Sequence, residues 1–154
     1  MNNGKIQHGG RQRGLAAVEF AIILPLMLLL ILATAELGRA FYLSNTLAKS
    51  VRDGARYVAD NAIEGTTGQI DLDGTLVSET RNIVLYGSIG GGTPLLQDFA
   101  PGDIAVTQVD VIHVQVSASY NFTPIFNRIP TFGLGAGDIE LNFPLQATVT
   151  MRAL

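Results

Sequence analysis

Near its N-terminus the chain reads Gly14-Leu-Ala-Ala-Val-Glu19-Phe20 and continues as Ala21-Ile-Ile-Leu-Pro-Leu-Met-Leu-Leu-Leu-Ile-Leu-Ala-Thr-Ala35. Residues 15–35 would extend roughly 31 Å as an α-helix at about 1.5 Å per residue, which matches a hydrocarbon core of about 30 Å. The stretch therefore predicts a transmembrane segment over residues 15–36. A carboxylate inside such a segment carries a cost of a few kcal/mol, so Glu19 is a candidate functional residue.

Charge is distributed unevenly along the chain. Residues 1–14 carry Lys5, Arg11 and Arg13 and no acidic side chain, whereas all 13 acidic residues lie in the remainder. A basic arm before an apolar span predicts a cytoplasmic N-terminus and a C-terminal part that crosses the membrane. The acidic remainder argues against nucleic acid as a partner, because nucleic acid binds basic surfaces. With no cysteine in the chain, disulfides and thiolate chemistry are excluded.

Three interpretations compete for residues 1–35. A secretory signal peptide has an A-x-A match at Ala33-Thr34-Ala35, but the apolar run exceeds the usual signal core of about 7–15 residues. A plain uncleaved anchor explains the length but not Glu19. The third interpretation is a prepilin leader over residues 1–14.

Gly14 followed by Leu15-Ala-Ala-Val-Glu19-Phe20 resembles the type IV prepilin pattern, in which a peptidase cuts after the glycine and a glutamate occupies the fifth mature position. Leu15 departs from the phenylalanine of many such pilins, which leaves its N-methylation open. In a bundle, Glu19 would pair with the Leu15 ammonium of a neighbour and set the axial register, with Phe20 beside it. The alternative is a glutamate that reaches the lipid headgroups.

Helical periodicity continues beyond the apolar run, through residues 37–60. Apolar or small residues recur at three- and four-residue steps, namely Leu37, Ala40, Phe41, Ser44, Leu47, Ala48, Val51, Ala55 and Val58. We therefore expect one helix of roughly 45 residues, half in lipid and half packed on a head, with a local kink at Pro25. A signal cut at Ala35 would sever this helix.

The segment Leu47-Ala-Lys-Ser-Val-Arg-Asp-Gly-Ala-Arg-Tyr-Val-Ala59, together with Glu36-Leu-Gly-Arg39 and the early Glu-Phe, is similar to TadE-like proteins. These are pseudopilins or minor pilins of tight-adherence (Tad/Flp) pili. The resemblance implies cleavage between Gly14 and Leu15, insertion in the bacterial inner membrane with a periplasmic head, and incorporation into a pilus that serves surface adherence. The implied partners are a prepilin peptidase, other pilins, the inner-membrane assembly platform and membrane lipid. Arg52 and Arg56 are candidate subunit contacts, and a solvated helix face is the alternative.

Residues 61–154 form the predicted extracytoplasmic head. Asp71-Leu-Asp-Gly-Thr-Leu-Val77 matches the first motif of haloacid-dehalogenase-type phosphohydrolases, but no lysine follows Lys49 and no strand precedes Asp71. We expect instead a loop that ends at Asp73 or Thr75 as the cap of a helix over residues 76–86. A calcium site at Asp71 and Asp73 lacks the later ligands of an EF-hand. No metal site, cofactor or catalytic set is predicted.

Strand patterning follows in the last third of the chain. Apolar and polar residues alternate over 112–120 and 145–151, and residues 104–109 suit a further strand. The sequence thus predicts an α+β, pilin-like fold with one long N-terminal helix, a short second helix and a small antiparallel sheet of three to four strands. The predicted function is structural rather than enzymatic, in pilus assembly. The alternative is an uncleaved bitopic inner-membrane protein with a periplasmic binding or sensing domain.

Overall fold

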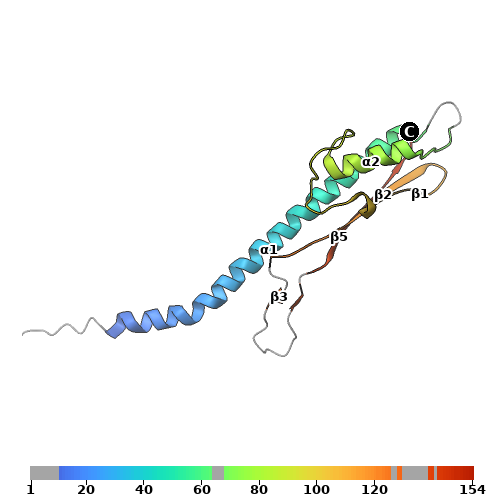
Figure 1. The fold of residues 1–154 in the computed structure, drawn as a ribbon. Helices are drawn as coiled ribbons and strands as arrows, with labels where there is room; N and C mark the ends of the chain where they lie inside the picture. The colour runs from blue at the N-terminus through green and yellow to red at the C-terminus, as the bar shows by residue number, and fades with distance from the viewer. Residues whose placement is uncertain (1–10, 64–67, 126–127, 130–138, 141) are drawn as a thin grey trace, which may run out of the picture. The chain divides into compact units, whose positions relative to one another are not determined.

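The computed structural model describes residues 11–63, 68–125, 128–129, 139–140 and 142–154. The chain divides into two compact units, Met1–Leu37 and Gly38–Leu154. The elements, drawn in Figure 1, are α1 (Arg11–Asn61), α2 (Gly74–Tyr86), the 3-10 turn η1 (Pro101–Asp103), β1 (Ile104–Gln108), β2 (His113–Asn121), β3 (Arg128–Ile129), β4 (Ile139–Glu140) and β5 (Pro144–Arg152).

Helix α1 is a single helix of 51 residues that runs from the first unit into the second. The prediction of one long helix is confirmed, and the polar residues after Ala35 do not interrupt it. Pro25 lies inside α1. Because proline has no N–H, the carbonyl of Ala21 lacks its usual helical donor at this point.

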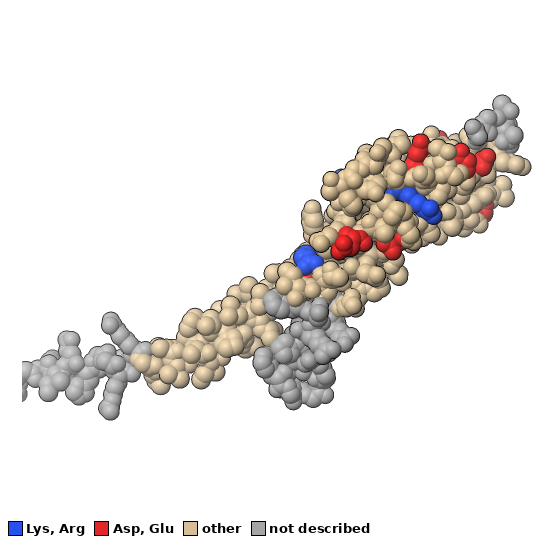
Figure 2. Space-filling model, viewed as in Figure 1, with Lys and Arg blue, Asp and Glu red and all other residues tan. Residues whose placement is uncertain are grey.

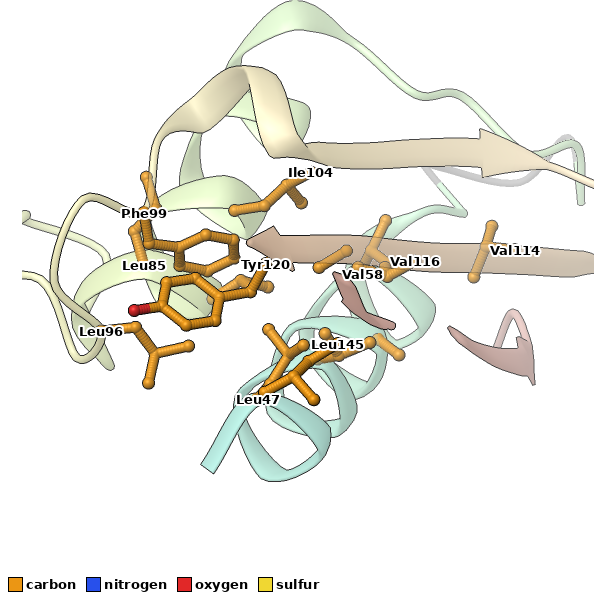
Figure 3. Packing of buried hydrophobic residues seen from close by; sticks show 14 of the residues in the cluster. Leu47, Val58, Leu85, Leu96, Phe99, Ile104, Val114, Val116, Tyr120 and Leu145 are labelled. Atoms are coloured by element: carbon orange, nitrogen blue, oxygen red, sulfur yellow. The ribbon is translucent and has the colours of Figure 1, made fainter. Parts of the chain in front are cut away.

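In the second unit, α1 supplies one side of the hydrophobic core. The buried hydrophobic residues of this part are Ala40, Leu47, Val51, Ala55, Val58 and Ala59, and Figure 3 shows Leu47 and Val58 among the side chains from the sheet. The predicted apolar face is therefore correct over most of its length. It fails at Leu37 and Phe41, which are 54% and 61% exposed. Periodicity alone did not separate these two residues from the buried set.

Helix α2 begins at Gly74, two residues before the predicted start, and ends at Tyr86 as predicted. Asp73 is its N-cap and accepts a hydrogen bond from the backbone N–H of Leu76 at 2.6 Å. Gly87 ends the helix with φ +74°, a left-handed conformation that suits glycine. The side chains buried on α2 are Leu76, Thr80, Val84 and Leu85.

The sheet has the strand order β1-β2-β5, and both pairings are antiparallel. Along β2 the residues Val114, Val116, Ala118 and Tyr120 are buried, and they alternate with more exposed polar residues. The predicted strand pattern is confirmed here, although Ile112 lies before β2. At the other end of the core, Tyr120 meets Phe99 edge to face with ring centroids 5.9 Å apart (Figure 3).

Strands β3 and β4 form a separate two-stranded ladder. The prediction of three to four strands thus corresponds to the three of the main sheet. The glycine-rich segment 133–137 lies outside the described residues. Together the long helix, the short helix and the antiparallel sheet form an α+β, pilin-like arrangement.

Contacts at the two ends of the head fix the direction of the strands relative to residues 38–61 of α1. At one end, the Arg39 Nη2 donates to the carbonyl of Thr123, just after β2, at 2.5 Å. At the other end, the N–H of Leu154, just after β5, donates to the carbonyl of Ala59 at 3.0 Å. Strand β5 therefore runs in the same direction as this part of α1, and β2 runs in the opposite direction.

Candidate assembly helix and cleavage site

The first unit presents apolar side chains to its surroundings. The large exposed apolar residues of this segment are Leu15, Val18, Phe20, Ile22, Ile23, Leu24, Leu26, Met27, Leu28, Leu30, Ile31 and Leu32. On the face drawn in Figure 2, the surface of this segment is almost entirely uncharged. Among the described residues, α1 is the one helix long and apolar enough to cross a membrane. The chain thus has the make-up of a single-pass membrane protein.

Gly14 and Leu15 lie near the start of α1, which begins at Arg11. Both are exposed, and a Cβ at Gly14 would meet no atom within 4 Å. Close packing is therefore not the reason for a glycine at position 14. The first turn of a helix frays readily, which is compatible with access of a peptidase to this bond.

Glu19 is exposed on α1, near the N-terminal end of the apolar surface. In the part of the chain that the structure describes, its carboxylate has no hydrogen bond or ion pair. It lies four residues beyond Leu15, about 6 Å along the helix axis. A carboxylate in this position has to obtain its partner from outside the subunit or from the membrane surface.

Arg52 and Arg56 lie in the second unit and are exposed on α1. The Nε of Arg56 is 3.9 Å from Oδ2 of Asp60, one turn further on. Exposed pairs of this kind contribute little to stability. Both arginines are thus exposed in the described part of the chain, and their role as subunit contacts stays a prediction.

Sequence reasoning missed Arg39. Besides its bond to the Thr123 carbonyl, its guanidinium lies 5.0 Å from the centroid of the Phe122 ring. Phe122 is fully buried and contacts Phe143. Arg39 thus joins the start of the head helix to the end of β2. The partners lie 84 residues away in sequence, and no local pattern reveals such a contact.

The two aspartates of the phosphohydrolase motif lie in a loop and at a helix cap. Asp71 is exposed in a loop, where its N–H donates to the carbonyl of Ala62 at 2.8 Å, and Asp73 caps α2. A shallow cavity of about 390 Å³ here is lined partly by Asp60, Asp71, Asp73 and Glu79. In the described residues, no group of three or more His, Asp or Glu side chains is placed to hold a metal ion.

His113 has a partner that the sequence analysis did not anticipate. Its Nδ1 lies 2.8 Å from Oδ2 of Asp110 in the β1–β2 turn. The carboxylate of Asp110 also accepts from the backbone N–H of Ile112 at 2.9 Å. The bond from Ile112, followed by that from His113, lowers the pKa of Asp110 below its usual range. These contacts shape the turn between β1 and β2.

These features define the class of protein as a pilin-like α+β subunit with an N-terminal membrane helix. The family model of TadE-like proteins matches residues 14–56, from the glycine of the cleavage motif to Arg56. Searches of curated proteins and of solved structures found no match. The similarity therefore lies in α1, in the segment that carries Glu19.

Proposed function

We propose that this protein is an inner-membrane prepilin of the Tad type, cut between Gly14 and Leu15, whose apolar helix then packs with other pilins in pilus biogenesis and surface adherence. The observation that carries the proposal is the unpartnered Glu19 on an exposed apolar helix, inside the segment that matches the TadE-like model. The partners of the protein in this proposal are a prepilin peptidase, other pilins, the inner-membrane assembly platform and membrane lipid.

Charge gives the proposed topology. The basic arm stays in the cytoplasm, and the acidic head lies in the periplasm until the subunit enters an extracellular pilus. Cleavage removes Lys5, Arg11 and Arg13 and leaves one new charge, the ammonium of Leu15. In a bundle of parallel helices, this ammonium on one subunit and Glu19 on its neighbour neutralise each other in apolar surroundings. A buried pair of this kind specifies register more than it adds stability.

The processing step is tested by sequencing the N-terminus of the protein from membranes of the native host. We expect Leu15 as the first residue. A terminus at Met1 would support the uncleaved bitopic protein with a binding or sensing domain, and one at Glu36 would support a secretory signal. Either outcome contradicts the proposal.

The role of Glu19 is tested by two variants. Glu19→Gln should leave cleavage intact but reduce surface pili at least tenfold, because the Leu15 ammonium loses its partner. Val18→Glu combined with Glu19→Val keeps the composition but moves the carboxylate about 100° around the helix, and it should fail in the same way.

Asp53→Asn serves as the matched control, since it removes an exposed carboxylate from the head part of α1. Pili counted by electron microscopy and the processed fraction on immunoblots are the two measurements. If the variant with the displaced carboxylate assembles pili normally, Glu19 only reaches the headgroups and the register role is wrong.

A further inference from the structure

The main sheet has two open edges. Strands β1 and β5 each pair with β2 and with no other strand in the described part of the chain. Among the described residues, no backbone hydrogen bond outside the helices and strands comes from the outer side of either strand. Within this part of the chain, the outward backbone groups of Ile104–Gln108 and Pro144–Arg152 are therefore available for a further strand.

The edge of β5 lacks the usual protection against strand addition. Natural edge strands carry inner prolines, charged side chains or bulges. In the nine residues of β5, the proline is the first and the arginine is the last, and all residues between them are uncharged. Facing the core, Ala147, Val149 and Met151 are only half-buried, whereas Val114 and Val116 of β2 are fully buried. An added strand would cover this apolar strip.

Strand direction decides which edge can add to β5 in a membrane protein. Two β5 strands paired around a two-fold axis would be antiparallel, and the head helices of the two copies would then point in opposite directions. Copies anchored in one membrane by the same basic arm share one orientation. Because β1 and β5 are both antiparallel to β2, they are parallel to each other. Strand β1 of a similarly oriented copy therefore has the direction required beside β5.

We propose that β5 of one subunit binds β1 of a second copy, head to tail, as a parallel extension of the sheet. The inference rests on the membrane anchoring in the proposed function, but not on the cleavage. Because this contact joins a β5 edge to a β1 edge, a pair of subunits still has one free β1 edge and one free β5 edge. The assembly therefore extends to further copies instead of closing as a dimer. Figure 1 shows the two strands on either side of β2.

The sheet also gives the register. In one subunit, Thr107 is level with Gln115 and Thr150, and Val106 is level with Val116 and Val149. If neighbouring copies are not shifted along the strands, Thr107 of the second copy lies beside Thr150 on the outer face. Shifts of two residues also keep the faces matched, and one such shift would place Thr107 beside Thr148.

Cysteine cross-linking tests this contact in the full chain, because the natural sequence has no cysteine. Thr107→Cys is combined with Thr150→Cys or with Thr148→Cys, and intact cells that express the variant are oxidised. Adjacent strands lie about 4.8 Å apart, within the Cα separation of about 4.4–6.8 Å that a disulfide accepts. We expect one of the two pairs to give a ladder of dimers, trimers and larger species on non-reducing gels.

Matched controls separate the contact from random collision. Thr150→Cys with Ser78→Cys places the second thiol on the exposed face of α2, and it should give no ladder. The single variants at 107, 148 and 150 should stay monomeric. A lysine is then added to the cross-linking pair at whichever of positions 148 and 150 does not carry the cysteine. Thr148→Lys or Thr150→Lys should abolish the ladder, because it places a charge on the edge strand. Ser119→Lys, on the same face of the central strand, should preserve it.

A dimer from Thr148→Cys or Thr150→Cys alone would indicate a two-fold β5 contact, and a dimer from Thr107→Cys alone would indicate a two-fold β1 contact. Either result would overturn the proposal. Cross-linking of both pairs no stronger than the Ser78 control would overturn it too. N-terminal sequencing of the same samples keeps the two proposals apart. A ladder without a Leu15 terminus supports the edge contact and contradicts processing, whereas a Leu15 terminus without a ladder does the reverse.

Discussion

At the scale of single residues, Gly54 allows the two helices of the head to approach closely. A Cβ at Gly54 would overlap Cγ2 of Val84 on α2 and would lie 3.5 Å from the carbonyl oxygen of Thr80. Val84 and Thr80 are fully buried, so neither has free space in which to move. The glycine is required by this packing and not by a special backbone conformation.

We therefore expect Gly54→Ala to destabilise the head by about 1–3 kcal/mol through overpacking. Gly38→Ala is the matched control, because it is a helical glycine of α1 whose Cβ would meet nothing within 4 Å. Alanine there should be neutral or stabilise by up to about 1 kcal/mol. Urea unfolding of the full chain in detergent micelles measures both. Equal midpoints for the two variants would contradict the packing argument.

At the scale of elements, one side-chain hydrogen bond joins α1 to α2. The hydroxyl of Tyr57 donates to Oε2 of Glu79 at 2.7 Å. This bond, with smaller contributions from burial and from the charge of Glu79, raises the pKa of Tyr57 above its ordinary value of 10.0. Since the folded state holds the proton more tightly, the stabilisation is fully present below pH 10.0 and is lost as pH rises through the folded pKa.

Tyr57→Phe should destabilise the head by about 1 kcal/mol at neutral pH, the usual net value of such a bond. The difference from wild type should shrink as pH rises above 10.0. Tyr42→Phe is the control, because Tyr42 is 70% exposed on the same helix. Thermal unfolding followed by circular dichroism across this pH range provides the measurement. A difference that persists unchanged at high pH would contradict the assigned role of the hydroxyl.

The elements also show what local sequence could and could not predict. The cap at Asp73 and the alternation along β2 are local signals, with periods set by the backbone, and both are confirmed. The exposure of Phe41 and the contacts of Arg39 depend on residues far away in sequence. Helix α2 meets α1 at Val84 and also lies beside β1 and η1. Leu85 is therefore buried in addition to the stripe of Leu76, Thr80 and Val84, which a single apolar stripe does not indicate.

At the scale of the whole molecule, the long apolar run predicted a membrane helix, and the helical and strand periodicities predicted an α+β head. The candidate site could also be proposed from the sequence, because Gly14, Leu15 and Glu19 are close together in the chain and form a motif without any tertiary contact. The open edges of the sheet could not be predicted, since strand order and direction come only from pairing between distant segments.

The distribution of burial along α1 bears on how a subunit would move during assembly. The hydrophobic core contains no residue before Ala40 among those described. Replacing lipid by protein around residues 15–35 therefore breaks no contact within that core. In the proposed assembly, a subunit would leave the bilayer with its head already folded, and only the apolar segment would exchange its surroundings. Cells could hold finished subunits in the membrane as a reservoir and draw on them without a refolding step.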